Sequence, residues 1–240
     1  MLNALFTGYL LAILSSWLKS SFDNYQLKNR SLLARSKCDH CGKKLKWFNL
    51  FPILSYYFQR GTSTCCKKKI SQNYLYIESF TFSIGCIFVF FEFSLSSILL
   101  IPFLVILVFL DEKYQEIPIW LNALILLIVS LSKENLDPIM LLNAGMIFLG
   151  LIIIYWLYKV FRKREGIGLG DIILIFSLSL YLEIPTIFLL ISISAALLIV
   201  KIIFSKDYNR PHAFGSWLSG CLIGFILFQE FYEFANSVPN

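Results

Sequence analysis

Charged residues are scarce in this sequence, and their scarcity excludes an ordinary water-soluble domain. Only 15% of the 240 residues are charged, whereas a soluble domain has roughly 25%. Hydrophobic residues make up 58% of the chain. We therefore expect a membrane protein, for which water is not the main solvent.

Long polar stretches are also lacking, except at residues 20–72. Apolar segments follow one another with short breaks, and several approach the length of about 20 residues that spans a bilayer. The first has no basic residue before it and no small-residue cleavage site after it, so we interpret it as a retained helix and not as a signal peptide. The eight segments cover residues 4–19, 73–91, 95–111, 117–131, 140–159, 171–182, 185–204 and 212–232.

These segments predict an all-α polytopic membrane protein with about eight transmembrane helices. Residues 1–19 are expected to form the first transmembrane helix. Residues 20–72 are expected to form a basic cytosolic region that contains cysteines, and residues 73–240 a seven-helix membrane core.

Basic residues are nearly absent from one side of this predicted bundle. When the segments cross the membrane alternately, 20 of the 21 Lys and Arg residues fall on one side, and only Lys133 falls on the other. Positive charge collects on the cytoplasmic side, so both termini are expected outside. The net charge of +6 therefore reflects topology, and no nucleic-acid partner is expected. The outer side instead carries acidic residues, namely Glu92, Glu134, Asp137, Glu183, Glu230 and Glu233.

Two aspartates adjoin apolar runs at the predicted cytosolic edge. Asp111 follows LVILVFL and Asp171 precedes IILIFSLSL. An acidic residue within a membrane segment costs about 3 kcal/mol, so it usually has a partner or a function, although each could also mark where a helix leaves the bilayer. When two carboxyl groups share a site, one tends to stay protonated while the other is ionised. Such a pair can activate a water molecule that attacks a peptide carbonyl. Helix dipoles favour ionised Asp171 and protonated Asp111 as a hypothesis.

Alternate glycines precede the second aspartate, in the sequence Gly166-Ile-Gly168-Leu-Gly170-Asp171. Glycine permits positive φ and close backbone approach, so an extended substrate could lie against Gly168 and Gly170. A glycine-rich turn before a helix can also hold phosphate. No Lys-Ser or Lys-Thr follows here, which disfavours that alternative.

A second CxxC pair is missing from the cysteine-containing region. Cys38 and Cys41 form one such pair, but adjacent Cys65 and Cys66 follow. Structural disulfides are rare in the reducing cytosol, so a zinc site of four thiolates is favoured, with reduced thiols as the alternative. The adjacency of Cys65 and Cys66 counts against zinc, because neighbouring side chains do not converge easily on one ion.

Four blocks of residues resemble the type IV prepilin peptidase family, the leader peptidases within the GxGD class of intramembrane aspartyl proteases. The resemblance covers most of the chain, and the four blocks together are far more specific than any one of them. They are Cys38-x-x-Cys41 through Tyr76-Ile77-Glu78, Asp111 with Ile117-Pro118, Glu165 with Gly168-x-Gly170-Asp171, and Pro211-x-x-Phe214-Gly215 with Gly220.

The resemblance implies an aspartic endopeptidase of the bacterial cytoplasmic membrane. It would cut the basic leader from type IV prepilin-like precursors (pilins, pseudopilins or competence pseudopilins) at the cytosolic face, with Asp111 and Asp171 as the catalytic pair. Many members also N-methylate the new terminus with S-adenosylmethionine. Ser63 stands where the family's second CxxC begins, and Ile173 replaces a common lysine, so the peptidase activity carries over more directly than methylation or zinc.

Acidic side chains are candidates to bind the leader lysines. Glu78 and Glu165 could do so, or they could pair with the chain's own lysines. Two other functions remain as alternatives. A carboxylate-lined transporter would place its acidic residues near the membrane midplane, and a noncatalytic membrane adaptor would not require Asp111 or the Gly-Asp turn.

Overall fold

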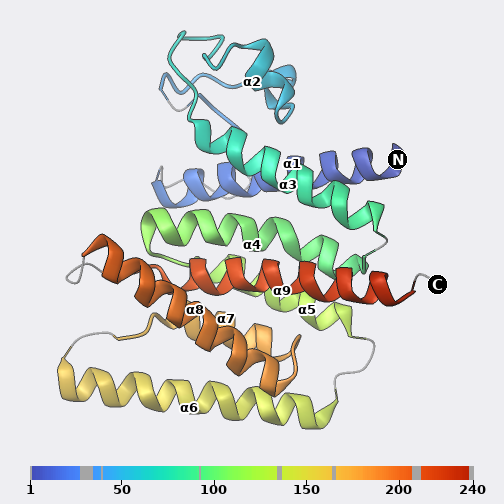
Figure 1. Cartoon of the computed structure of the whole chain (residues 1–240). Coiled ribbons are helices and arrows are strands. Elements are labelled where there is room, and N and C mark those ends of the chain that lie inside the picture. Colours follow the sequence, from blue (N-terminus) through green and yellow to red (C-terminus); the bar gives the residue numbers. More distant parts are fainter. Residues whose placement is uncertain are drawn as a thin grey trace. The chain divides into compact units, whose positions relative to one another are not determined.

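A computed structural model describes residues 2–27, 35–38, 40–91, 93–133, 137–163, 166–206 and 212–237. Within these ranges the regular structure is helical, apart from two isolated β-bridges. The all-α prediction is therefore confirmed. The chain divides into two compact units, residues 1–106 and 107–240 (Figure 1).

The eight predicted segments coincide with eight helices of unequal length. Five described helices are long and apolar enough to cross a membrane. α5 has 14 residues and α7 has 11, and a helix of 11 residues extends only about 16 Å of the roughly 30 Å hydrocarbon core. The count of eight spans therefore stays a prediction. The helices are α1 (Leu2–Phe22), α3 (Gln72–Phe90), α4 (Leu95–Tyr114), α5 (Ile119–Ser132), α6 (Pro138–Arg162), α7 (Leu169–Ser179), α8 (Ile184–Ser205) and α9 (Phe214–Ser237), of which α3, α4, α6, α8 and α9 are the five.

In the first unit, α1 packs along α3 through glycine (Figure 1). A Cβ atom on Gly8 would lie 2.8 Å from the carbonyl oxygen of Phe82, and one on Gly85 would lie 2.9 Å from the Cα of Gly8. Small residues that let two backbones approach are a common way for helices to pack in lipid. The pair therefore forms a close-packed base for the segment between the two helices.

A buried polar layer joins α1 to the start of α3. Lys19 Nζ lies 2.7 Å from Asp23 Oδ2, and both side chains are 10% exposed. The Tyr74 hydroxyl donates to the same oxygen at 3.0 Å, and the Lys19 ammonium lies 4.0 Å from the centre of the Tyr74 ring. These contacts fix the end of α1 against the start of α3.

The described residues between α1 and α3 form three short helices and two tight turns. The π-helix η1 (Asp23–Leu27) continues from α1, and the 3-10 helix η2 (Trp47–Leu50) and α2 (Leu54–Phe58) lie between the turns. Each turn is closed by one β-bridge, between Lys37 and Lys44 in the first and between Thr62 and Lys69 in the second.

In the second unit, the short helix α7 lies at the centre. It packs against α5, α6, α8 and α9, and most of its residues after Asp171 are buried. Its first turn carries the Gly-Asp sequence, so the bundle surrounds the backbone that presents Asp171.

Candidate aspartate site and cysteine cluster

Asp111 lies in the last turn of α4 and is held by the beginning of α9. Only 5% of its surface is exposed. The backbone N–H of Ser216 donates to Asp111 Oδ2 at 2.6 Å. Ser216 belongs to the first turn of α9, where N–H groups have no partner within the helix and the dipole is positive. The start of α9 therefore stabilises a negative charge on Asp111.

Asp171 lies in the first turn of α7 and is half-buried. Its side chain folds back over the turn that precedes the helix. Asp171 Oδ2 lies so close to Gly168 that a Cβ atom added there would be 3.2 Å from it. The other oxygen, Oδ1, is buried and has no hydrogen bond of good geometry among the described residues. Asp171 Oδ1 therefore lies inside the site, beside Gly215.

The two carboxyl groups converge at Gly215. A Cβ atom on this glycine would lie 2.8 Å from Asp171 Oδ1 and 3.1 Å from Asp111 Oδ2, so the two oxygens are within about 6 Å of each other. This separation is close enough for two charges to interact and for one water molecule to lie between them. Asp111 and Asp171, which are distant in sequence, thus face one point.

A donor that the sequence-based hypothesis did not include lies beside Asp111. The hypothesis considered only the two helices that carry the aspartates, whereas α9 directs its own N-terminus at Asp111. A backbone N–H donor stabilises an ionised carboxylate, and such donors lie beside both carboxyl groups, from Ser216 and Gly215 at Asp111 and from Gly168 and Gly215 at Asp171. Which aspartate holds the proton therefore stays a prediction.

Ile117 packs against two glycines of the aspartate site, Gly170 and Gly215. It lies just before α5, and a Cβ atom on Gly170 would be 2.9 Å from the Cβ of Ile117. Asn122 Nδ2 donates to the carbonyl oxygen of Gly170 at 3.0 Å. Packing therefore explains why residue 170 is glycine. Gly168 is exposed and is the more accessible of the two glycines that were predicted to bind substrate.

Three functional contacts were not predicted from the sequence. Ser216 was not recognised as a donor to Asp111, because a backbone N–H has no side-chain signal. Its hydroxyl also donates to Glu112 Oε2 at 3.3 Å, and Glu112 Oε1 pairs with Lys201 Nζ at 2.5 Å. The motif Pro211-x-x-Phe214-Gly215 was the only sequence signal near this region.

Glu78, a predicted leader-binding residue, is engaged within the first unit. It is 6% exposed, and both of its oxygens accept hydrogen bonds. Ser16 Oγ donates to Oε1 at 2.6 Å, and the backbone N–H of Ile53 donates to Oε2 at 2.7 Å. Ile53 has a φ of 61°, an unfavourable value for a β-branched residue. Glu78 therefore anchors the segment after η2 to α1 and α3. The other candidate, Glu165, lies outside the described residues.

Replacing Glu78 is expected to affect stability before specificity. Glu78→Ala leaves the Ile53 N–H without its acceptor and should destabilise the protein by about 1–3 kcal/mol. Glu78→Gln keeps an acceptor for Ile53 and an amide for Ser16, so its thermal unfolding in detergent should be close to that of the wild type. If instead both variants kept the wild-type unfolding temperature and both raised the KM for substrate, Glu78 would bind the leader.

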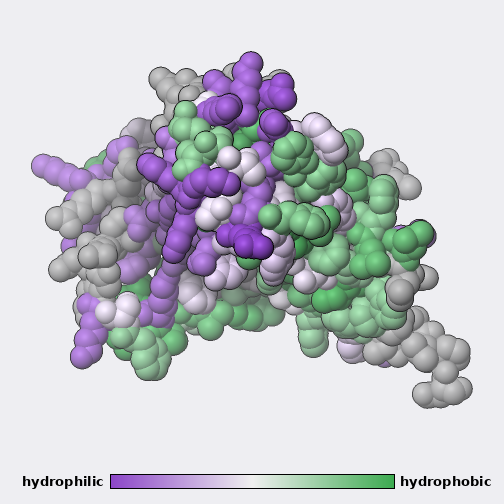
Figure 2. Space-filling model, turned by 90° about the horizontal axis from the view of Figure 1, so that it is seen from above, coloured by the Kyte–Doolittle hydropathy of each residue, from purple (hydrophilic) through white to green (hydrophobic). Residues whose placement is uncertain are grey.

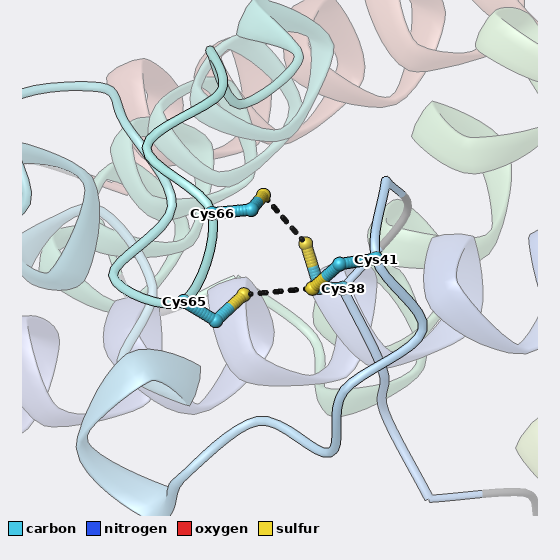
Figure 3. Close-up of side chains that lie close together, drawn as sticks. All are labelled: Cys38, Cys41, Cys65 and Cys66. Carbon is cyan, nitrogen blue, oxygen red and sulfur yellow. Dashed lines mark hydrogen bonds between the residues drawn. The ribbon is translucent and has the colours of Figure 1, made fainter.

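Four cysteine sulfurs form a compact cluster in the first unit (Figure 3). All four Sγ atoms lie within 4.8 Å of one another, and all four thiols are free. Cys65 approaches Cys41 at 3.2 Å, and Cys66 approaches Cys38 at 3.7 Å. A tetrahedral zinc ion with Zn–S bonds of 2.3 Å requires sulfur separations of about 3.8 Å. The cluster can therefore hold a metal ion, since the adjacent cysteines reach different partners.

The two turns that carry the cysteines repeat the same backbone geometry. In residues 37–44, Cys38 N donates to Lys43 O and Gly42 N donates to Cys38 O. In residues 62–69, Ser63 N donates to Lys68 O and Lys67 N donates to Ser63 O. Gly42 and Lys67 also share a positive φ, of 70° and 59°.

This repeat defines equivalent positions. Cys66 corresponds to Cys41, whereas Ser63 corresponds to Cys38, and Cys65 corresponds to His40. Ser63 is buried, and its Oγ lies 2.9 Å from Cys65 Sγ and 3.4 Å from Cys38 Sγ. The second turn therefore carries one of its cysteines at position 65, two residues after the position equivalent to Cys38. The Ser63 hydroxyl occupies that equivalent position.

The surroundings of Cys38 favour its thiolate, the form that binds metal. Burial by itself would raise the pKa of Cys38. Hydrogen bonds with Ser63 and with the backbone of Cys41 and His40 outweigh the burial and lower this pKa to about 6. Ser63 therefore contributes a hydrogen bond that supports negative charge on sulfur.

Comparison with known proteins gives matches along most of the chain. Residues 10–93 match the family model "Bacterial Peptidase A24 N-terminal domain", and residues 98–204 match "Type IV leader peptidase family". No solved structure matches significantly.

Curated relatives carry the name prepilin leader peptidase/N-methyltransferase. The relative from Neisseria gonorrhoeae is 30% identical over 211 residues, which are 80% of this chain and 70% of the relative. The relative from Xanthomonas campestris pv. campestris is 31% identical over 202 residues, 78% of this chain and 69% of the relative. The relative from Pectobacterium carotovorum subsp. carotovorum is 28% identical, with 80% and 74% covered. The chain therefore belongs to the type IV prepilin leader peptidase family.

Proposed function

We propose that this protein is a prepilin leader peptidase that uses Asp111 and Asp171 as a catalytic pair. The observation that supports this best is the convergence of Asp111 Oδ2 and Asp171 Oδ1 at Gly215, in a chain of this family. The distribution of Lys and Arg supports a site at the cytosolic face of the bacterial cytoplasmic membrane, with both termini outside.

In the proposed mechanism, ionised Asp111 acts as the general base. It takes a proton from a water molecule between the carboxyl groups, and the resulting hydroxide attacks the carbonyl carbon of the scissile peptide bond. Protonated Asp171 donates its proton to the carbonyl oxygen. When the tetrahedral intermediate collapses, Asp111 gives the proton that it took to the leaving amine, and Asp171 recovers its own. The Ser216 N–H keeps Asp111 ionised between cycles.

Substrate binding is proposed to use the exposed turn before α7. Gly168 has no side chain to prevent an extended peptide from lying beside Asp171, and Leu169 next to it is also exposed. The basic leader would remain on the cytosolic side, while the hydrophobic segment that follows the cut would enter the membrane beside the bundle. Glu165 remains a proposed contact for leader lysines.

Coexpression with a prepilin-like precursor tests this function. We expect a shorter product on a gel when the peptidase is present, and mass spectrometry of the new N-terminus would locate the cut. A precursor that keeps its full length in the presence of folded, membrane-inserted protein would contradict the proposal. The same spectrum tests N-methylation, which the names of the relatives suggest and which would need S-adenosylmethionine.

We also propose that Cys38, Cys41, Cys65 and Cys66 hold a structural zinc ion. The sulfur separations and the hydrogen bonds to Cys38 support this, and four thiolates are a ligand set that zinc prefers. The ion would supply a cross-link between the two turns. It would contribute to folding rather than to peptide hydrolysis.

Exchange of residues 63 and 65 tests the ligand set. Cys65→Ser should weaken zinc binding by more than the roughly 10–100-fold that loss of an outer-shell partner costs, because it removes a ligand. Adding Ser63→Cys to this variant should restore binding, because position 63 is equivalent to Cys38. Chelator competition measures the affinity, and cobalt substitution reports how many thiolates bind. Retention of zinc by Cys65→Ser with unchanged affinity would exclude Cys65 as a ligand.

A further inference from the structure

An uncharged stretch interrupts the basic region between α1 and α3. Residues 47–59, WFNLFPILSYYFQ, contain no charged side chain, although Lys43, Lys44 and Lys46 precede them and Arg60 follows. Four of the first five residues after Lys46 are aromatic or leucine. A segment of this composition is unexpected in a domain surrounded by water.

Large apolar side chains of this stretch point away from the protein. The exposed fraction is 71% for Trp47, 68% for Tyr57 and 85% for Phe58, and Phe48, Leu50 and Leu54 are also exposed. In Figure 2, hydrophobic residues lie directly beside hydrophilic ones on the face that carries this segment. A group of exposed apolar side chains next to lysines is typical of a site that contacts a membrane.

Hydrogen bonds place the middle of this stretch beside the transmembrane helices. The Lys19–Asp23–Tyr74 layer lies near the end of α1 and the start of α3. Ile53 is held by Glu78, which lies one helical turn, about 5 Å, further toward the middle of α3. The Tyr9 hydroxyl, from the first half of α1, donates to the carbonyl oxygen of Pro52 at 3.4 Å. Pro52 and Ile53 therefore lie alongside α1 and α3, further along the two helices than the Lys19–Asp23–Tyr74 layer.

We infer that residues 47–58 form an interfacial segment that inserts into the cytosolic leaflet of the lipid bilayer. The aromatic and leucine side chains occupy the boundary between headgroups and acyl chains, a region about 5–10 Å deep that amphipathic segments use. The basic residues on both sides lie at the level of anionic headgroups, where each contributes about 1 kcal/mol of attraction. The turns that carry the cysteines then face the cytosol.

Trp47 provides a reporter of this depth. The full-length wild type and Trp47→Phe are reconstituted into vesicles of phosphatidylcholine and phosphatidylglycerol, with plain or brominated acyl chains. Bromine quenches tryptophan only on contact, so the difference spectrum of the two proteins isolates Trp47 from the other four tryptophans. We expect Trp47 emission to lose most of its intensity in brominated vesicles and to resist aqueous iodide. Trp156→Phe is the matched control, since Trp156 is 59% exposed on the membrane-length helix α6.

Phe58→Trp in the Trp47→Phe background repeats the measurement at the far end of the segment. Quenching by bromine at both positions supports the inference. Quenching by iodide alone would place the segment in water and overturn it. Resistance to both quenchers would show that protein covers the segment, which would also overturn it. None of these results depends on peptidase activity or on zinc.

Discussion

Cleavage of a prepilin-like precursor is expected to fall by about 10⁴-fold or more when either Asp111 or Asp171 is replaced by asparagine. Asparagine keeps the shape of the side chain, and its carbonyl oxygen can still accept from the Ser216 N–H. It cannot accept or deliver the proton that each step of hydrolysis moves. Initial rates with purified protein in detergent measure the loss, and a gel of coexpressed precursor shows it qualitatively.

A matched aspartate controls for general effects of the substitution. Asp137 caps α6, where its side chain accepts from the Ile139 N–H at 3.0 Å. Asparagine is an equally good N-cap, so Asp137→Asn should retain wild-type cleavage. Cleavage that survived both Asp111→Asn and Asp171→Asn would remove the catalytic assignment, and absence of cleavage by the wild type would favour a role as an adaptor or transporter.

A single methyl group at Gly215 is expected to lower cleavage by about 10²-fold or more, which is the cost of misplacing reacting groups by about 1 Å. The added Cβ would lie 2.8 Å from Asp171 Oδ1, 3.1 Å from Asp111 Oδ2 and 2.5 Å from Ile117 Cδ1. It would occupy the point where we place the attacking water. Gly215→Ala should therefore lower kcat more than it changes the KM.

Two further variants separate this effect from a change in folding. Gly220 lies on the same helix, and a Cβ atom there would meet nothing within 4 Å, so Gly220→Ala should be fully active. Ile117→Val added to Gly215→Ala removes the contact with Cδ1 but not those with the carboxyl groups, so activity should stay low. Recovery of activity in this double variant would show that Ile117 packing, and not the carboxyl pair, made glycine necessary.

Hydropathy predicted the helices well because the bilayer imposes one length scale on every spanning segment. Each of the eight apolar segments lies on a helix, including the short one that begins beside Gly170. The pairing of Asp111 with Asp171 was expected from topology, and their approach to a common point agrees with that expectation. Their catalytic roles stay a prediction until they are measured.

Other features depended on three-dimensional contacts that no pattern encodes. The donor to Asp111 is a backbone N–H, which every residue except proline has, so nothing distinguished Ser216 in advance. The adjacency of Cys65 and Cys66 counted against a shared metal site. The repeated turn geometry places their sulfurs near different partners and removes that objection. Glu78 was a candidate to bind the substrate, but both of its oxygens accept hydrogen bonds from the protein itself.

The displacement between Ser63 and Cys65 also describes how such a cluster can change over generations. Both positions reach the same group of sulfurs, so a chain with cysteine at 63 and at 65 has five thiols for four coordination positions. Loss of either cysteine from that chain leaves a complete set. A ligand position can thus move from residue 63 to residue 65 by two substitutions, the gain of one cysteine and then the loss of the other. Every chain on that path would keep at least four thiols for the proposed metal ion.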